Sequence, residues 1–192
     1  MTFNATQIRE DFPIFERTIR EGKRLVYLDS GATSQKPNVV IEAESNFYRL
    51  HNAAVHRGAH QLAEEATDAY EGARGIVAQF LGAASDEIIF TKSATESLNL
   101  LAYAFGNAYS GNRFHLQPGD RIVVTEMEHH ANLIPWQELA KRTGAELAWF
   151  SVDESGRLDL SDIDSVITVK TKVVALTHQS NVLGTINPLD AI

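Results

Sequence analysis

Residues 92–95 combine a lysine, two hydroxyl side chains and the expected start of a helix, directly after an expected strand. The unpaired amides of a first helical turn and the positive end of the helix dipole attract anions, so this segment could hold a phosphate group. The same residues also fit an ordinary capping box, in which Ser93 and Glu96 satisfy the first turn. The spacing leaves both interpretations open, a phosphate site and a structural cap.

His129 and His130 stand next to each other in a loop that also follows an expected strand. Imidazoles can act as general acid and base, stack on a flat ligand or bind a metal. A metal is the weakest option, because neighbouring side chains diverge and no His-Glu-x-x-His pattern is present, so no metal site is predicted. A surface or structural role for the two histidines remains an equal alternative.

Three further segments carry groups suited to an anionic ligand. Residues 178–184 supply an amide, a hydroxyl and a glycine, residues 29–33 supply small side chains, and His56 with Arg57 adds an imidazole and a guanidinium. Each has a structural explanation as well, and Arg57 could simply form an ion pair. The sequence contains no glycine-rich nucleotide loop, nucleophile elbow or deaminase motif that competes with these segments.

The composition limits the classes of function. The 192 residues are 44% hydrophobic and 22% charged, which suits one globular unit with a sizeable core. A formal charge of −8 makes nucleic acid an unexpected partner. The sequence has no cysteine, which excludes disulfides, thiolate metal sites and a cysteine nucleophile on this chain. No apolar stretch has the length of a membrane span, so we expect a soluble, cytoplasmic protein.

Strands and helices alternate after a polar N-terminal arm. Short apolar runs predict strands at residues 25–28, 87–91, 121–125, 146–152 and 173–177. Three- and four-residue periodicity predicts helices over residues 37–48, 62–81 and 93–105, and a fourth that follows the loop at 126–131 and reaches residue 143. Gly82 and Gly144 end two of these helices. The pattern predicts an α/β fold with a mostly parallel sheet and helices on both faces. We divide the chain into an arm, residues 1–24, and a partial large domain, residues 25–192.

Five segments follow one another in a fixed order along the chain: YLDSGATSQKP at 27–37, AVHRG at 54–58, TKSATESLN at 91–99, EMEHHANLIPW at 126–136 and SNVLG at 180–184. Together they resemble the Suf-type cysteine desulfurases of the class V aminotransferase family. The fourth is the most distinctive, and bacterial-type selenocysteine lyases share it. The resemblance covers essentially the whole chain. It implies the large domain of a pyridoxal-phosphate (PLP)-dependent transferase of fold type I, incomplete here, with flanking helices around its sheet.

The resemblance also implies a cofactor site for PLP. The backbone at Ala94 and Thr95, with the Thr95 hydroxyl, would hold the cofactor phosphate, and His129 would stack on the pyridine ring and assist proton transfer. Asn181 would contact the cofactor's phenolic oxygen or the substrate carboxylate. Family members often have a second threonine at the position of Ala94, so one potential hydroxyl is missing here.

On the substrate side, the resemblance implies L-cysteine as substrate. Gly31 and Ala32 would border its carboxylate, and His56 with Arg57 would line the same side. Family members often carry alanine where Gly31 stands. The products would be L-alanine and an enzyme-bound persulfide, passed to a Suf-type acceptor protein for iron–sulfur cluster assembly, and the enzyme would be a homodimer.

The chain is expected to be the N-terminal half of such an enzyme and inactive alone. Pro188 suits the start of a helix, yet the sequence stops at Ile192. The family's Schiff-base lysine, pyridine-binding aspartate and persulfide cysteine lie in motifs beyond this point, and none of the six lysines here has the required context. The strand at 87–91 would pair with the missing half, so an open edge and poor solubility are predicted.

Two alternatives to a desulfurase stay open. The parent could be a selenocysteine lyase or another class V aminotransferase-family enzyme. A cysteine on a late active-site loop would favour a desulfurase, and its absence would favour these alternatives. The chain could also be a non-catalytic half-domain that binds a full-length subunit.

Overall fold

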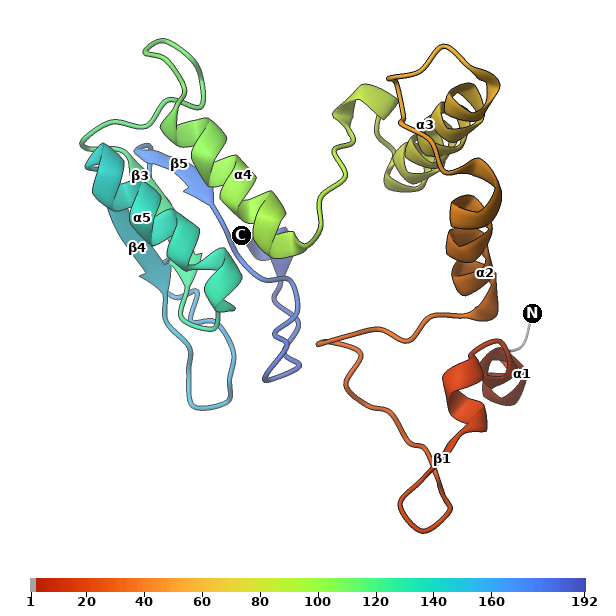
Figure 1. Ribbon diagram of the computed structural model, residues 1–192. Helices are drawn as coiled ribbons and strands as arrows, with labels where there is room; N and C mark the ends of the chain where they lie inside the picture. The colour runs from red at the N-terminus through yellow and green to blue at the C-terminus, as the bar shows by residue number, and fades with distance from the viewer. Residues whose placement is uncertain (1–2) are drawn as a thin grey trace. The chain divides into compact units, whose positions relative to one another are not determined.

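The computed structural model describes residues 3–192, and the chain divides into two compact units (Figure 1). The first unit ends at Ile89 and the second begins at Phe90. This division falls at a different place from the arm boundary at residue 24, which stays a prediction. Within the described residues, no helix is long and apolar enough to cross a membrane.

The first unit begins with two short helices and a small hairpin. Helix α1 spans Ala5–Glu10, and a 3-10 turn follows at Pro13–Glu16. Strands β1 (Thr18–Ile19) and β2 (Lys23–Arg24) pair antiparallel. The strand predicted at 25–28 is wrong: these residues form no strand, and Leu28 is 91% exposed. An apolar run becomes a strand only when another strand pairs with its backbone, and among the described residues none does so here.

The helices predicted in this unit are confirmed. Helix α2 spans Asn38–Asn46 and continues as a π-helical turn at Phe47–His51. Helix α3 spans Gln61–Leu81 and ends at Gly82, which has a φ of 68°. A residue in this left-handed conformation commonly ends a helix, because its amide reaches back to the last turn.

The strand predicted at 87–91 is also wrong. A 3-10 turn occupies Ser85–Glu87, Ile88 has an extended backbone, and residues 88–91 are not part of any strand. The carbonyl of Ile88 accepts a hydrogen bond from the Arg74 guanidinium instead of from a neighbouring strand. Because residues 87–91 form no strand, the open strand edge expected here does not form, and poor solubility stays a prediction.

The second unit is built on a three-stranded parallel sheet in the order β4-β3-β5. Its elements in chain order are α4 (Ala94–Gly106), β3 (Arg121–Thr125), a 3-10 turn (His130–Asn132), α5 (Ile134–Thr143), β4 (Glu146–Phe150), α6 (Ile163–Val166), β5 (Thr171–Val174) and a 3-10 turn (Leu189–Ala191). In register, Val123 of β3 lies opposite Ala148 of β4 and Val174 of β5. These strands match three of the predicted ones, with β4 and β5 shorter at their carboxyl ends.

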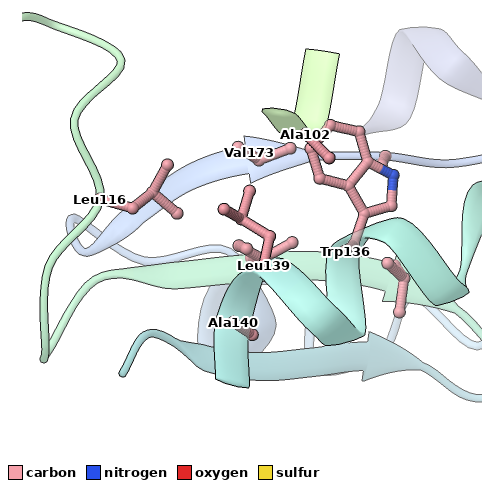
Figure 2. Close-up of a cluster of buried hydrophobic side chains, with 9 residues drawn as sticks. Ala102, Leu116, Trp136, Leu139, Ala140 and Val173 are labelled. Carbon is pink, nitrogen blue, oxygen red and sulfur yellow. The ribbon is translucent and has the colours of Figure 1, made fainter. Parts of the chain in front are cut away.

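Side chains of β3 alternate between two cores, one on each face of the sheet. Ile122 and Val124 are buried with Trp136 and Leu139 of α5, and Figure 2 shows these two α5 side chains close to Ala102 and Val173. On the other face, Val123 and Phe150 pack with residues of α6 and its surroundings. Helices α4 and α5 lie side by side on the first face (Figure 1). The predicted α/β architecture with flanking helices on both faces is confirmed.

Candidate functional site

A pocket of about 660 Å³ lies in the second unit, between α4, β5 and the loop after β3. Ala94 lines it from the start of α4, His129 from the loop after β3, and Thr177 from the segment after β5. The remaining lining residues are Leu98, Leu101, Phe105, Glu128, Ala131, Asn132, Trp136, Lys172, Val173, Val174, Ala175 and Leu176. Two of the candidate residues, Ala94 and His129, therefore share one cavity.

The start of α4 is capped and still leaves two amides available. The Ser93 hydroxyl accepts a hydrogen bond from the Glu96 amide (3.3 Å), and a Glu96 carboxylate oxygen accepts one from the Lys92 amide (2.5 Å). Glu96 thus reaches one residue further back than in a standard capping box. Over residues 3–192, no acceptor is found for the amides of Ala94 and Thr95, and both residues are exposed. The cap and an anion site can therefore coexist.

His129 presents one ring nitrogen to a backbone amide and leaves the other free. Its Nδ1 accepts a hydrogen bond from the Ala131 amide at 3.0 Å, so the neutral ring carries its proton on Nε2. In the described part of the chain, Nε2 has no hydrogen-bond partner. His130 is exposed and does not line the pocket, although its ring centroid lies 6.4 Å from that of His129. The two adjacent histidines therefore face different surroundings.

Asn181 is not among the residues that line the pocket. It is exposed in the segment that follows β5, whereas its neighbour Ser180 is buried. The Ser180 hydroxyl accepts hydrogen bonds from the amides of Val182 (3.3 Å) and Leu183 (3.1 Å), which fixes a tight turn. A contact of Asn181 with a cofactor or substrate stays a prediction.

The sequence profile of the class-V aminotransferases matches residues 26–192 of this chain. The chain belongs to this family. A protein named "Probable cysteine desulfurase" from Streptomyces coelicolor is 57% identical over 186 residues, which are 96% of this chain and 44% of that protein. A cysteine desulfurase of Serratia proteamaculans is 48% identical over 193 residues, covering 100% of this chain and 46% of that one.

Solved structures of desulfurases resemble the fold over the full length of the chain. The cysteine desulfurase of Thermococcus onnurineus NA1 superimposes with a TM-score of 0.86 at 40% identity, covering 100% of this chain and 44% of that one. The cysteine desulfurase CsdA of Escherichia coli gives a TM-score of 0.79 at 38% identity, with 100% and 45% covered. The chain thus spans less than half the length of the relatives it matches.

Members of this family of class-V aminotransferases and cysteine desulfurases depend on PLP. The pocket and the adjoining start of α4 offer groups that fit such a molecule. Ala94 lines the pocket and Thr95 does not. Within residues 3–192 their two amides have no acceptor, and together with the Thr95 hydroxyl they suit a phosphate. The imidazole of His129 is exposed at the same cavity, which suits an aromatic ring.

The candidate substrate-side residues belong to the first unit. Gly31 and Ala32 lie in an exposed turn, where the Ala32 amide donates to the carbonyl of Asp29 at 3.1 Å. His56 has a φ of 60°, and its amide donates to the Thr67 hydroxyl of α3 at 3.0 Å. Arg57 is exposed, and no ion pair is found for it within residues 3–192. Their place beside a substrate stays a prediction.

The sequence reasoning missed several residues that line the pocket. Thr177 ends an expected strand and could have been named by the same rule that selected His129. Lys172 lies near the amino end of β5, where no motif marks it. Glu128 belongs to a sequence motif, but its partner after β5, Thr177, lies 49 residues away in sequence, so no local pattern reveals the contact.

Proposed function

We propose that this chain provides the phosphate-binding and ring-stacking part of a PLP-dependent cysteine desulfurase of the Suf type. The parent enzyme would convert L-cysteine to L-alanine and pass the sulfur, as a persulfide, to a Suf-type acceptor protein for iron–sulfur cluster assembly. One observation carries the proposal: Ala94 and His129 line the same pocket in a chain of the class-V aminotransferase family. The Suf type is supported by the Glu-His-His-Ala-Asn segment with its Pro-Trp, at residues 128–136.

In this proposal the amides of Ala94 and Thr95 and the Thr95 hydroxyl bind the cofactor phosphate. His129 stacks on the cofactor ring, and Asn181 contacts the phenolic oxygen or the substrate carboxylate. When bound, PLP supplies an electron sink for the bonds at the substrate Cα. The protein's part is to orient and to manage protons: the Ala131 amide occupies Nδ1 of His129, so Nε2 is the atom that holds the transferable proton.

On the substrate side, Gly31 and Ala32 would border the carboxylate of L-cysteine, and His56 with Arg57 would line the same side. The parent enzyme would act in the cytoplasm as a homodimer. The chain alone would be inactive, since it contains no cysteine that could carry the persulfide.

The test compares the two adjacent histidines in the full-length protein that contains this sequence. We expect His129→Gln to lower alanine formation from L-cysteine by roughly 100-fold, the usual contribution of a positioned acid or base. His130→Gln is the matched control and should change the rate little, because His130 does not line the pocket. Equal losses in both variants, or activity on selenocysteine alone, would exclude the proposed function.

A further inference from the structure

Glu128 is a buried carboxylate that gathers three hydrogen-bond donors from separate parts of the second unit. It is 8% exposed. Its Oε1 accepts hydrogen bonds from the Thr125 hydroxyl at the end of β3 (2.8 Å) and from the Thr177 amide after β5 (2.7 Å). Its Oε2 accepts one from the side-chain amide of Asn132 (2.8 Å). These contacts join two strand ends and the loop between β3 and α5.

The contact with Asn132 continues into the core. Asn132 Oδ1 accepts a hydrogen bond from the indole nitrogen of Trp136 at 2.9 Å, and Trp136 is 3% exposed. The Asn132 backbone amide donates to the carbonyl of His129 at 2.8 Å. Glu128 and Asn132 therefore stand on either side of the turn that carries His129, and their side chains link its two ends.

We propose that Glu128 is the positioning residue for His129: by tying the turn to both strand ends, it fixes the imidazole at the pocket. This use of His129 rests on the proposed function. The fixed turn places the Ala131 amide against Nδ1 of His129, at 3.0 Å, which determines the nitrogen that remains free. Without the tie from Glu128, the ring would lose this defined orientation.

A carboxylate is needed here because all three partners donate. An ionised carboxylate accepts at both oxygens, whereas a glutamine amide accepts at one end and donates at the other. If the new side chain in Glu128→Gln kept its oxygen toward the Thr177 amide, its NH₂ group would face the Asn132 amide. Asn132 would then have to turn over, and Trp136 would lose its acceptor. The opposite orientation would leave the Thr177 amide without an acceptor, so the substitution always leaves an N–H group of this network without its acceptor.

The experiment uses the 192-residue chain without cofactor and follows it by nitrogen-15 and proton NMR. In Glu128→Gln we expect the Ala131 amide to exchange with solvent about tenfold faster, as for a lost hydrogen bond. The ring C–H signals of His129 should shift, and either the Trp136 indole or the Thr177 amide should lose protection. Glu138→Gln, an equal change of charge at an exposed position of α5, is the control and should match the unmodified chain.

A change at Trp136 or Thr177 with wild-type signals for Ala131 and His129 would overturn the proposal, since Glu128 would then be a structural tie only. Thr125→Val provides a milder second variant in case Glu128→Gln does not fold. It removes one donor while keeping the shape of the side chain, and we expect exchange of the Ala131 amide to rise about threefold. No change in that variant would also overturn the proposal. These NMR signals are measured without cofactor or substrate. They therefore test the role of Glu128 even if the desulfurase assignment fails.

Discussion

His56 Nε2 lies 2.9 Å from Glu71 Oε1, so an imidazole on a loop with left-handed backbone is tied to a carboxylate on α3. The same carboxylate pairs with Arg74, whose Nε lies 2.9 Å from its other oxygen. The Thr67 hydroxyl, one turn earlier on α3, accepts from the His56 amide. A strained loop conformation persists only where its surroundings hold it, and here α3 supplies these contacts.

The tie predicts a specific pH dependence of stability. Hydrogen bonds from Arg74 and then His56 lower the pKa of Glu71 below its ordinary value of 4.5. When folding lowers the pKa of a carboxyl group, the ionised group stabilises the fold at pH values above the pKa that it has in the unfolded chain. This contribution is lost as the pH falls through the pKa of the folded state. We therefore expect Glu71→Gln to lower the midpoint of urea unfolding near neutral pH. The difference from the unmodified chain should shrink as the pH falls below 4.5.

The control for this measurement is Asp68→Asn, an equal change of charge at an exposed position of the same helix. It should leave the urea midpoint close to that of the unmodified chain at every pH. A deficit in Glu71→Gln that stays constant down to strongly acidic pH would contradict the prediction, because the loss would then not depend on the ionised carboxylate.

The second prediction concerns the anion site at the start of α4. In the full-length protein, Thr95→Val should weaken PLP binding about tenfold, because it removes one hydroxyl donor and leaves the two amides in place. Fluorescence titration of the cofactor-free protein measures the dissociation constant. Thr6→Val, the same change at an exposed position of α1, is the control. Unchanged affinity in Thr95→Val would place the phosphate elsewhere.

Local signals in the sequence predicted the helix ends well, while strands without partners were mispredicted. Gly82 and Gly144 both adopt positive φ at helix ends, and the Ser93 cap forms as expected. These features depend only on neighbours within a turn. The segments 25–28 and 87–91 have strand-like composition but no strand to pair with among the described residues, and composition cannot supply a partner.

The same distinction applies to the site. Ala94 and His129 could be brought together from the sequence, because both follow strands of a parallel sheet and strand ends share one edge. Asn181 satisfies the same rule, yet the turn fixed by Ser180 leaves it outside the pocket lining. The Glu128 network depends on Thr177, and only the three-dimensional sheet places these two residues in contact.

The third prediction is that the chain by itself does not complete desulfuration. Mixed with PLP and L-cysteine, the 192 residues should release no sulfide above the rate of free cofactor, since the chain has no cysteine side chain that could accept the sulfur. Sulfide assay and alanine analysis measure both products, with the full-length protein as positive control. Sulfide release that grows with the concentration of the chain would refute this.

The fourth prediction tests the core beneath the pocket. Leu139 is 1% exposed and packs in the cluster shown in Figure 2. Leu139→Ala should lower the free energy of unfolding by about 2–5 kcal/mol, because it removes buried methyl groups and leaves a cavity. Leu100→Ala, at a 42% exposed position of α4, is the control and should cost far less. Similar losses in both variants would mean that this core does not limit stability.

The last prediction compares two glycines of the α3 region that should respond in opposite directions. Gly72 lies inside α3, and apart from its chain neighbours and the nearby backbone of α3 no atom lies within 4 Å of an added Cβ, so Gly72→Ala should stabilise the chain by roughly 0.5–1 kcal/mol. Gly82 has equal space, but its φ of 68° disfavours any side chain, so Gly82→Ala should destabilise by about 1 kcal/mol. Urea unfolding measures both. The same sign in the two variants would contradict the role of backbone conformation, because the two sites offer equal room for the new methyl group.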